Sequence, residues 1–187
     1  MARVLLLFAL ISGDTRVYSG EILNTQAFHT NSDFEIISSM LIQGDSRAVF
    51  KVLTDYEKLA EISDIVLDTA KVTKNLSLKE GPIRVRINTR TCVLMFCFKA
   101  RIVEDVEVTG DMTIKADIVP ELSDFKADQI IIQVQDYPEG KTHVKFESRF
   151  TPDFWISPII GPKIVKHKAI KTTTNTIFQI EKLINDE

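Results

Sequence analysis

The sequence has few of the residues that metal sites and nucleophilic enzymes need. Its three histidines, His29, His143 and His167, lie far apart on three different predicted elements, without the His-x-x-x-His spacing of a ligand pair. We therefore expect no metal and no other cofactor. The chain also lacks a Gly-x-Ser-x-Gly elbow, and neither His143 nor His167 has a visible nucleophile partner. No catalytic residue is predicted.

An excess of positive charge is also missing. The 23 lysines and arginines are fewer than the 26 acids, the formal net charge is −3, and the two signs are interleaved along the chain. Nucleic acid is therefore a poor candidate as a partner. With 187 residues, 44% of them hydrophobic and 26% charged, the chain has the composition of one globular domain with enough apolar mass for a core.

No apolar run is long enough to span a bilayer, which takes about 20 residues. The run at residues 4–11 follows Arg3 and precedes a polar stretch, which is typical of a cleaved signal peptide. We place this leader at residues 1–19, because small residues at Val17 and Ser19 allow a cut before Gly20. The alternative is a buried N-terminal strand. Removal of a leader predicts a periplasmic or secreted protein.

The two cysteines, Cys92 and Cys97, flank four apolar residues where a hairpin tip in water would normally carry Gly, Asn or Asp. Pairing about residues 94–95 would place the cysteines opposite each other, and an exported protein meets an oxidising compartment, so we predict a disulfide. The alternative is one long strand with two free thiols on opposite faces.

Hydrophobic periodicity predicts a strand, a helix, about six strands and a long helix. The expected segments are a flexible lead-in at residues 20–32, a strand at 34–42, a helix capped by Asp45 and broken near Asp55, strands of period two at 65–151, and a helix from 163 to 187, with the domain itself at 33–187. This order favours an α+β fold in which a curved antiparallel sheet closes around the C-terminal helix. Val165, Ala169, Thr173, Ile177, Ile180 and Ile184 form the expected inward stripe of that helix, with Glu181 largely elsewhere on its circumference.

Several segments resemble the START-like superfamily, also called SRPBCC. They are residues 52–56, the strand pair around 92–105, residues 120–125 and residues 151–155. Within the superfamily they are most similar to secreted bacterial members of the polyketide cyclase and coenzyme Q-binding branch. The resemblance implies a helix-grip fold with a deep apolar cavity between the sheet and the last helix. The apparent leader departs from the quinone-binding members, which act inside cells or mitochondria.

The expected function is non-catalytic binding of a small hydrophobic ligand, such as a lipid, a quinone or an aromatic compound. Strand alternation and the helical stripe select the expected ligand contacts, which are Phe98, Ala100, Ile102, Ile114, Phe146, Val165, Ala169, Thr172, Thr173 and Thr176. The small and polar residues at the middle of the helix favour a cavity. The alternative is that large sheet residues such as Phe98, Phe146 and Phe150 fill the space.

Two other functions stay open. An enzyme of the cyclase or dehydratase kind would use Glu104 or Tyr56 as acid or base, since Glu104 shares the strand parity of Ile102 and would face the cavity. A buried Glu104 would need a partner, which an arginine at position 84, 86 or 90 could supply. A lipid-surface module would use the apolar tip and Trp155, and would make transient membrane contact through lysines 163, 166 and 168.

Overall fold

The computed structural model describes residues 20–72, 82–93, 96–153, 156, 159 and 161–186. The predicted leader, residues 1–19, lies outside them. The elements are β1 (Glu21–Thr30), β2 (Asp33–Gln43), α1 (Ser46–Thr54), α2 (Leu59–Ile62), β3 (Val66–Lys71), β4 (Ile83–Val93), β5 (Phe96–Thr109), β6 (Thr113–Ile118), the 3-10 helix η1 (Pro120–Leu122), β7 (Phe125–Tyr137), β8 (Lys141–Pro152) and α3 (Gly161–Asp186).

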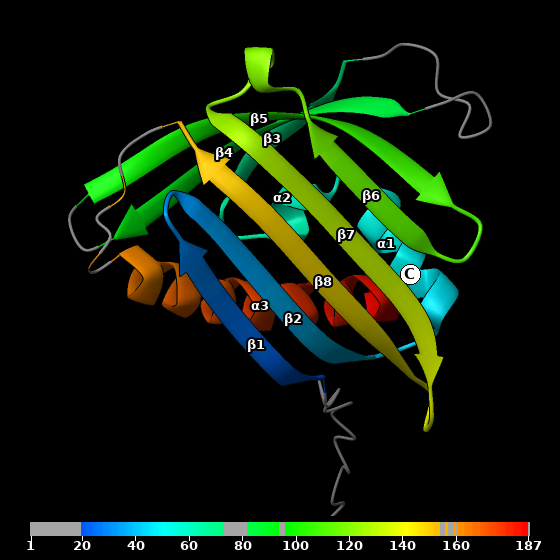
Figure 1. The fold of residues 1–187 in the computed structure, drawn as a ribbon. Helices are drawn as coiled ribbons and strands as arrows, with labels where there is room; N and C mark the ends of the chain where they lie inside the picture. Colours follow the sequence, from blue (N-terminus) through cyan, green and yellow to red (C-terminus); the bar gives the residue numbers. More distant parts are fainter. Residues whose placement is uncertain are drawn as a thin grey trace, which may run out of the picture.

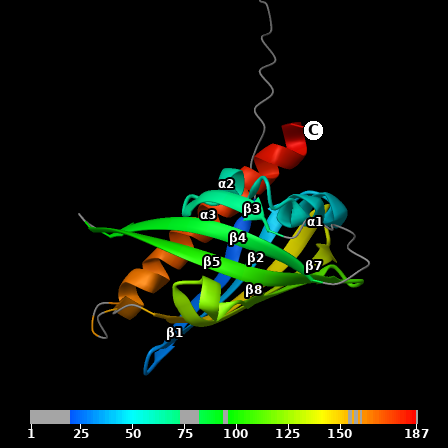
Figure 2. The same ribbon diagram turned by 90° about the horizontal axis from the view of Figure 1, so that it is seen from above.

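The strands form a single antiparallel sheet in the order β1-β2-β8-β7-β6-β5-β4-β3. The sheet is curved, and α1, α2 and α3 all lie on its concave side, with α3 running across the strands (Figures 1 and 2). The predicted α+β helix-grip fold is therefore confirmed. Six strands, β3 to β8, separate the first helices from the last one, as the turn signals predict.

The N-terminal edge of the sheet differs from the prediction. Instead of the flexible lead-in expected at residues 20–32, the chain forms β1, which pairs with β2 from Glu21 opposite Leu41 to Thr30 opposite Asp33. The register shifts between Ile22 and Asn24, and this shift interrupts the alternation of apolar and polar residues from which a strand is predicted. Beyond the shift, the inward positions carry small or polar side chains, so β1 lacks an apolar pattern.

The helix predicted after Asp45 is present and is broken where expected. The Asp45 carboxylate accepts the backbone N–H groups of Arg47 (2.9 Å) and Ala48 (3.3 Å), which satisfies two of the free donors at the start of α1. The helix ends at Thr54 with Asp55 as its C-cap, and a separate short helix, α2, follows.

The hydrophobic core lies between the sheet, α1, α2 and the C-terminal half of α3. Its buried members are Met40, Ile42, Val49, Val52, Leu53, Tyr56, Ile62, Ile83, Val85, Val106, Ile114, Ala116, Val134, Val144, Ile177 and Ile180. By contrast, no α3 residue from 162 to 176 is fully buried. The two halves of α3 therefore have different surroundings: one closes the core, and the other leaves its inward side incompletely covered.

The hairpin between β4 and β5 carries the predicted disulfide. Cys92 and Cys97 are direct partners in the register, their Cα atoms are 4.0 Å apart, and their sulfurs are bonded. The prediction of a cross-strand disulfide is confirmed. No helix in the described part of the chain is long and apolar enough to cross a membrane.

Candidate functional site

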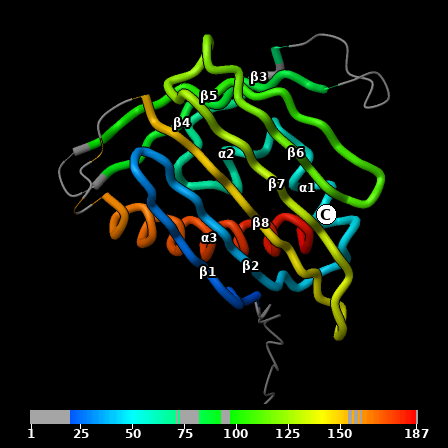
Figure 3. The backbone as a smooth tube through the Cα atoms, in the orientation of Figure 1, coloured from blue at the N-terminus to red at the C-terminus, as the bar shows by residue number. Residues whose placement is uncertain are grey.

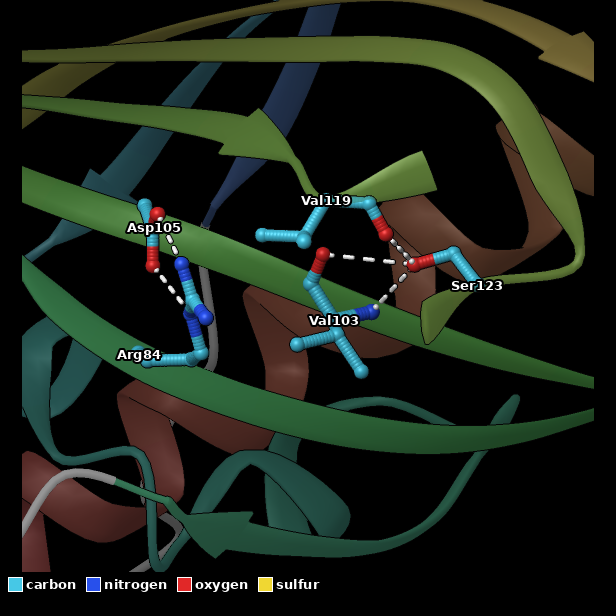
Figure 4. Close-up of polar contacts among 5 residues, drawn as sticks. All are labelled: Arg84, Val103, Asp105, Val119 and Ser123. Carbon is cyan, nitrogen blue, oxygen red and sulfur yellow. Dashed lines mark hydrogen bonds and ion pairs between the residues drawn. The ribbon is translucent and has the colours of Figure 1, made fainter. Parts of the chain in front are cut away.

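Glu104 lies on the concave face of the sheet, as strand alternation predicts. Figure 4 shows the polar contacts of the two residues that flank it in sequence, Val103 and Asp105. The Val103 N–H donates to the Ser123 hydroxyl (2.9 Å), which also lies 2.9 Å from the Val119 carbonyl, while Asp105 forms an ion pair with Arg84. Glu104 is opposite Val85 in the register and shares the strand parity of Val106, and both valines belong to the core, so its side chain faces inward, where it is only 3% exposed.

The arginines predicted as partners of Glu104 lie on the opposite side of the sheet. Arg84 makes two hydrogen bonds of 2.7 Å to the Asp105 carboxylate, and Arg86 and Arg90 share its strand parity. An internal pair of Glu104 with an arginine, which the sequence left open, is therefore absent from the described residues. Arg84 instead forms an ion pair with Asp105 on the convex face, where both side chains are about one-third exposed.

The charge state of Glu104 is governed by burial. Loss of solvation, with smaller contributions from the carboxylates of Asp128 and Asp117, raises the pKa of its carboxyl from 4.5 to about 8. At neutral pH this side chain mostly carries its proton, and it can both donate and accept a hydrogen bond.

Asp128 is a second acid on the concave face, and it was not among the predicted site residues. It shares strand parity with Ile130, Ile132 and Val134 in β7, a signal that alternation alone would have provided. Burial raises the pKa of its carboxyl to about 7, although the nearby Ser148 hydroxyl and Gln129 N–H act in the opposite direction. Its Oδ1 atom is buried and has no hydrogen-bond partner among the described residues.

Tyr56, between α1 and α2, is the third polar group on this side of the sheet. It belongs to the core, but its hydroxyl is buried without a hydrogen-bond partner among the described residues. Burial, with a smaller contribution from the charge of Glu104, raises the pKa of the phenol to about 12. The hydroxyl therefore stays protonated and remains available as a donor.

An aromatic group lies next to Asp128 on the concave face. Phe150, opposite Asp128 in the register, stacks on Phe34 with ring centroids 5.3 Å apart, and Phe125 meets it edge to face at 6.1 Å. The ring of His29 adds a tilted contact to Phe34 at 4.5 Å. The two acids and the phenol are thus combined with a flat apolar surface, as in sites for small organic molecules.

The predicted ligand contacts on the strands differ in burial. Ala100, Ile102 and Phe146 lie on the concave face and are partly buried, and Phe98 lies on the same face near the disulfide but is 52% exposed. Ile114 is packed in the core.

The predicted ligand contacts on the last helix are all partly buried residues of α3, namely Val165, Ala169, Thr172, Thr173 and Thr176. Ala169 and Thr173 are 11 and 7 residues from buried Ile180, close to whole numbers of turns, so they share its inward face. Thr172 instead donates to Asp64 at 3.0 Å, at the junction of α2 and β3.

A metal centre is not supported by the described residues, which contain no cluster of three or more His, Cys, Asp or Glu side chains suited to a metal. His143 is partly buried, and its Nε2 atom lies 2.6 Å from the Ser39 hydroxyl. The loop with Trp155, and with it the predicted apolar surface, falls largely outside the described residues.

Known proteins resemble this chain in fold but not in sequence. No protein-family model and no curated protein matches the sequence. Solved structures do match. A START superfamily protein from Mycobacterium smegmatis has a TM-score of 0.62 at 12% identity, over 81% of this chain and 97% of its own. The fold is START-like. At this identity the likeness establishes the architecture and nothing about the ligand.

Two further START-like structures are described by their activities. The Zhui aromatase/cyclase from Streptomyces sp. R1128 has a TM-score of 0.62 at 10% identity, covering 82% of this chain and 94% of its own. A STAR-related lipid transfer protein from Xanthomonas axonopodis has a TM-score of 0.58 at 10% identity, covering 83% and 98%. The START-like fold therefore accommodates both an enzyme and a lipid carrier.

Proposed function

We propose that this START-like chain binds a small, largely apolar molecule that carries a hydroxyl or carbonyl group, on the concave face between the sheet and residues 162–176 of α3. The observation that carries the proposal is the pair of buried polar atoms without partners among the described residues, Asp128 Oδ1 and the Tyr56 hydroxyl. An unpaired buried polar atom costs about 1 to 3 kcal/mol, so such atoms are rare unless a ligand or water completes them.

The surroundings of these atoms favour an apolar ligand. The concave face carries Ala100, Ile102 and Phe146, and the aromatic group adds stacked rings. The part of α3 opposite them carries small or polar inward residues, none of them fully buried. The described lipid transfer and aromatase/cyclase structures of the same fold support this class of ligand.

A first experiment asks whether a ligand is present. Protein purified from its own cells is extracted with organic solvent, and bound lipids, quinones or aromatic compounds are identified by mass spectrometry. The same extraction is repeated with Ala169→Trp, which adds bulk on the inward face of α3, and with the control Ile170→Trp on its exposed face. We expect ligand in the native and control extracts and none with Ala169→Trp, which should still fold. An empty native extract together with an unfolded Ala169→Trp protein would mean that side chains fill the space.

A second experiment tests the polar contacts. The neutral fluorescent probe N-phenyl-1-naphthylamine is displaced with 1-decanol and with decane, which differ in one hydroxyl group. We expect the wild-type protein to prefer the alcohol by about tenfold, which corresponds to one hydrogen bond worth about 1.4 kcal/mol. Tyr56→Phe removes only the phenolic hydroxyl, and Asp128→Asn removes the acid, so each should reduce the preference. Equal affinity of the wild-type protein for both compounds would contradict the proposal.

We also propose that the protein works in the periplasm or outside the cell. The signal-peptide profile of residues 1–19 and the disulfide between Cys92 and Cys97 support this location, because disulfides persist in oxidising compartments. Fractionation of the native cells, with detection of the protein by antibody, tests it, and a cytoplasmic pool alone would contradict it.

Acid–base catalysis is the second candidate function. The observation in its favour is that the pKa values of Glu104 and Asp128, about 8 and about 7, lie near neutrality, where proton transfer is most efficient. Such an enzyme would cyclise or dehydrate a hydrophobic substrate. Its test is to incubate the extracted compound with fresh protein and to follow loss of water by mass, with Glu104→Gln as the inactive control. A compound that stays unchanged indicates carriage.

A further inference from the structure

We propose that hydrolysis of the Ser19–Gly20 bond releases an α-ammonium group on Gly20 that pairs with the buried carboxylate of Glu181. The site lies at the edge of the sheet, where β1 begins beside α3 (Figure 3). The inference rests on the proposed export of the chain and is independent of the ligand.

Glu181 is a buried carboxylate that lacks a cation among the described side chains. The sequence places it largely away from the inward stripe of the last helix, but in the structure it is only 1% exposed. Its Oε1 atom accepts the backbone N–H of Gln43 at 2.7 Å, whereas Oε2 is buried with no hydrogen-bond partner among the described residues. Burying a charged group without a partner costs free energy, so we expect a positively charged donor to pair with this oxygen.

Gly20 is in direct proximity to this carboxylate. A Cβ atom built on Gly20 would lie 2.5 Å from Glu181 Oε1, 2.3 Å from a methyl group of Ile177 and 2.9 Å from the Leu41 carbonyl. The Gly20 Cα therefore lies within about 4 Å of that oxygen, and its nitrogen, one bond further, within about 5.5 Å. Glycine is the residue that fits here, because any side chain would overlap three neighbours.

The surface around the two residues leaves room for a free chain end. A hollow of about 410 Å³ is lined by Gly20, Ile22, Thr174, Ile177, Phe178 and Glu181. Glu181 is the one charged residue among these six. The charged side chains next to it in sequence or on β1, Lys182 and Glu21, are both exposed. The ammonium group of Gly20 is therefore the cation best placed to reach the carboxylate.

The chemistry is an ordinary peptide hydrolysis. Water adds to the Ser19 carbonyl, the C–N bond to Gly20 breaks, and the leader leaves with a terminal carboxylate. The amine that stays on Gly20 is protonated at neutral pH, since an α-amino group has a pKa of about 7.7 to 8.0. The reaction requires only water and an endopeptidase of the export machinery. Valine and serine at positions 17 and 19 fit the small residues that such peptidases accept.

The first measurement is made on the full chain, produced with its own leader in an exporting bacterial host. N-terminal sequencing of the exported protein should start at Gly20. The pKa of the new α-amine is then measured by competitive labelling with acetic anhydride across pH, followed on the N-terminal peptide. Pairing with Glu181 should raise this pKa above the ordinary range, and an amine whose pKa is higher by one is labelled about tenfold more slowly at neutral pH.

The Glu181→Gln variant distinguishes the effect of the ion pair from an effect on folding. The amide oxygen can still accept the Gln43 N–H, but the negative charge is gone. Labelling of Gly20 should return to the ordinary rate, while the control Glu121→Gln, an exposed acid in η1, should leave it unchanged. Wild-type protein should also lose its advantage in unfolding temperature over Glu181→Gln as pH rises through the raised pKa of the amine.

Two results overturn the proposal, and they are distinguishable. An exported protein that starts elsewhere than Gly20 overturns the cleavage site and leaves the proposed export standing, whereas a protein that retains Met1 overturns both. A protein that starts at Gly20 but has an α-amine of ordinary pKa overturns the ion pair alone. The second result is obtained with the wild-type chain, so it stands even where Glu181→Gln does not fold.

Discussion

Replacing Glu104 with glutamine removes the buried acid on the concave face while nearly keeping the shape of its side chain. Burial raises the pKa of Glu104 from 4.5 to about 8. Between these two values the folded protein holds a proton that the unfolded chain has lost, so the wild-type protein loses stability as pH rises. Glutamine has no such proton, and the difference between the two proteins should therefore depend on pH.

The size of the effect follows from the two pKa values. Each pH unit between about 4.5 and 8 should cost the wild-type protein about 1.4 kcal/mol relative to Glu104→Gln. At pH 7 the variant should be the more stable protein by about 3 kcal/mol, and near pH 4.5 the two should be alike. This figure is an upper limit, because water that enters the opened site would solvate the charge.

The assay is denaturant unfolding followed by circular dichroism at four pH values from about 5 to 8. Glu107→Gln is the matched control, because Glu107 lies on the same strand but is exposed on the convex face. Its difference from wild type should not change with pH in this window. Parallel stability curves for wild type and Glu104→Gln would refute the reasoning, since they would mean that the carboxyl is solvated or paired.

Three further predictions concern the framework of the site. Cys92→Ser opens the short disulfide loop and should lower the free energy of unfolding by about 2 kcal/mol. Intact-mass measurement of the native protein should show a gain of two hydrogens on reduction, and two free thiols before reduction would contradict the disulfide. Ser123→Ala leaves the Val103 N–H without its acceptor and should destabilise by about 1 to 2 kcal/mol in denaturant unfolding; an unchanged midpoint would contradict this role. Arg84→Ala breaks a pair with Asp105 whose side chains are about one-third exposed, so it should cost at most about 1 kcal/mol and less in high salt, and a larger, salt-independent loss would contradict the surface location.

Local pattern was enough to predict the features that depend on neighbours along the chain. The cap at Asp45 and the break at Asp55 are set by side chains within a few residues. The pairing of Cys92 with Cys97 follows from a hairpin only a few residues long. Alternation along one strand also placed Glu104 on the same face as Ile102, because successive side chains of a strand point to opposite faces.

Tertiary structure decided which acids are buried and what they face. Alternation showed that Arg84 and Glu104 have fixed faces on their strands, but only the register between β4 and β5 put them on opposite sides of the sheet. Glu181 is buried at the sheet edge, where it lies against Gly20 and Gln43, both far away in sequence. Asp128 has a raised carboxyl pKa because it is buried, and that burial depends on neighbours from another strand, such as Phe150 on β8. The sequence of one element specifies its hydrophobic period. The solvation of a side chain depends on every other element that covers that side chain.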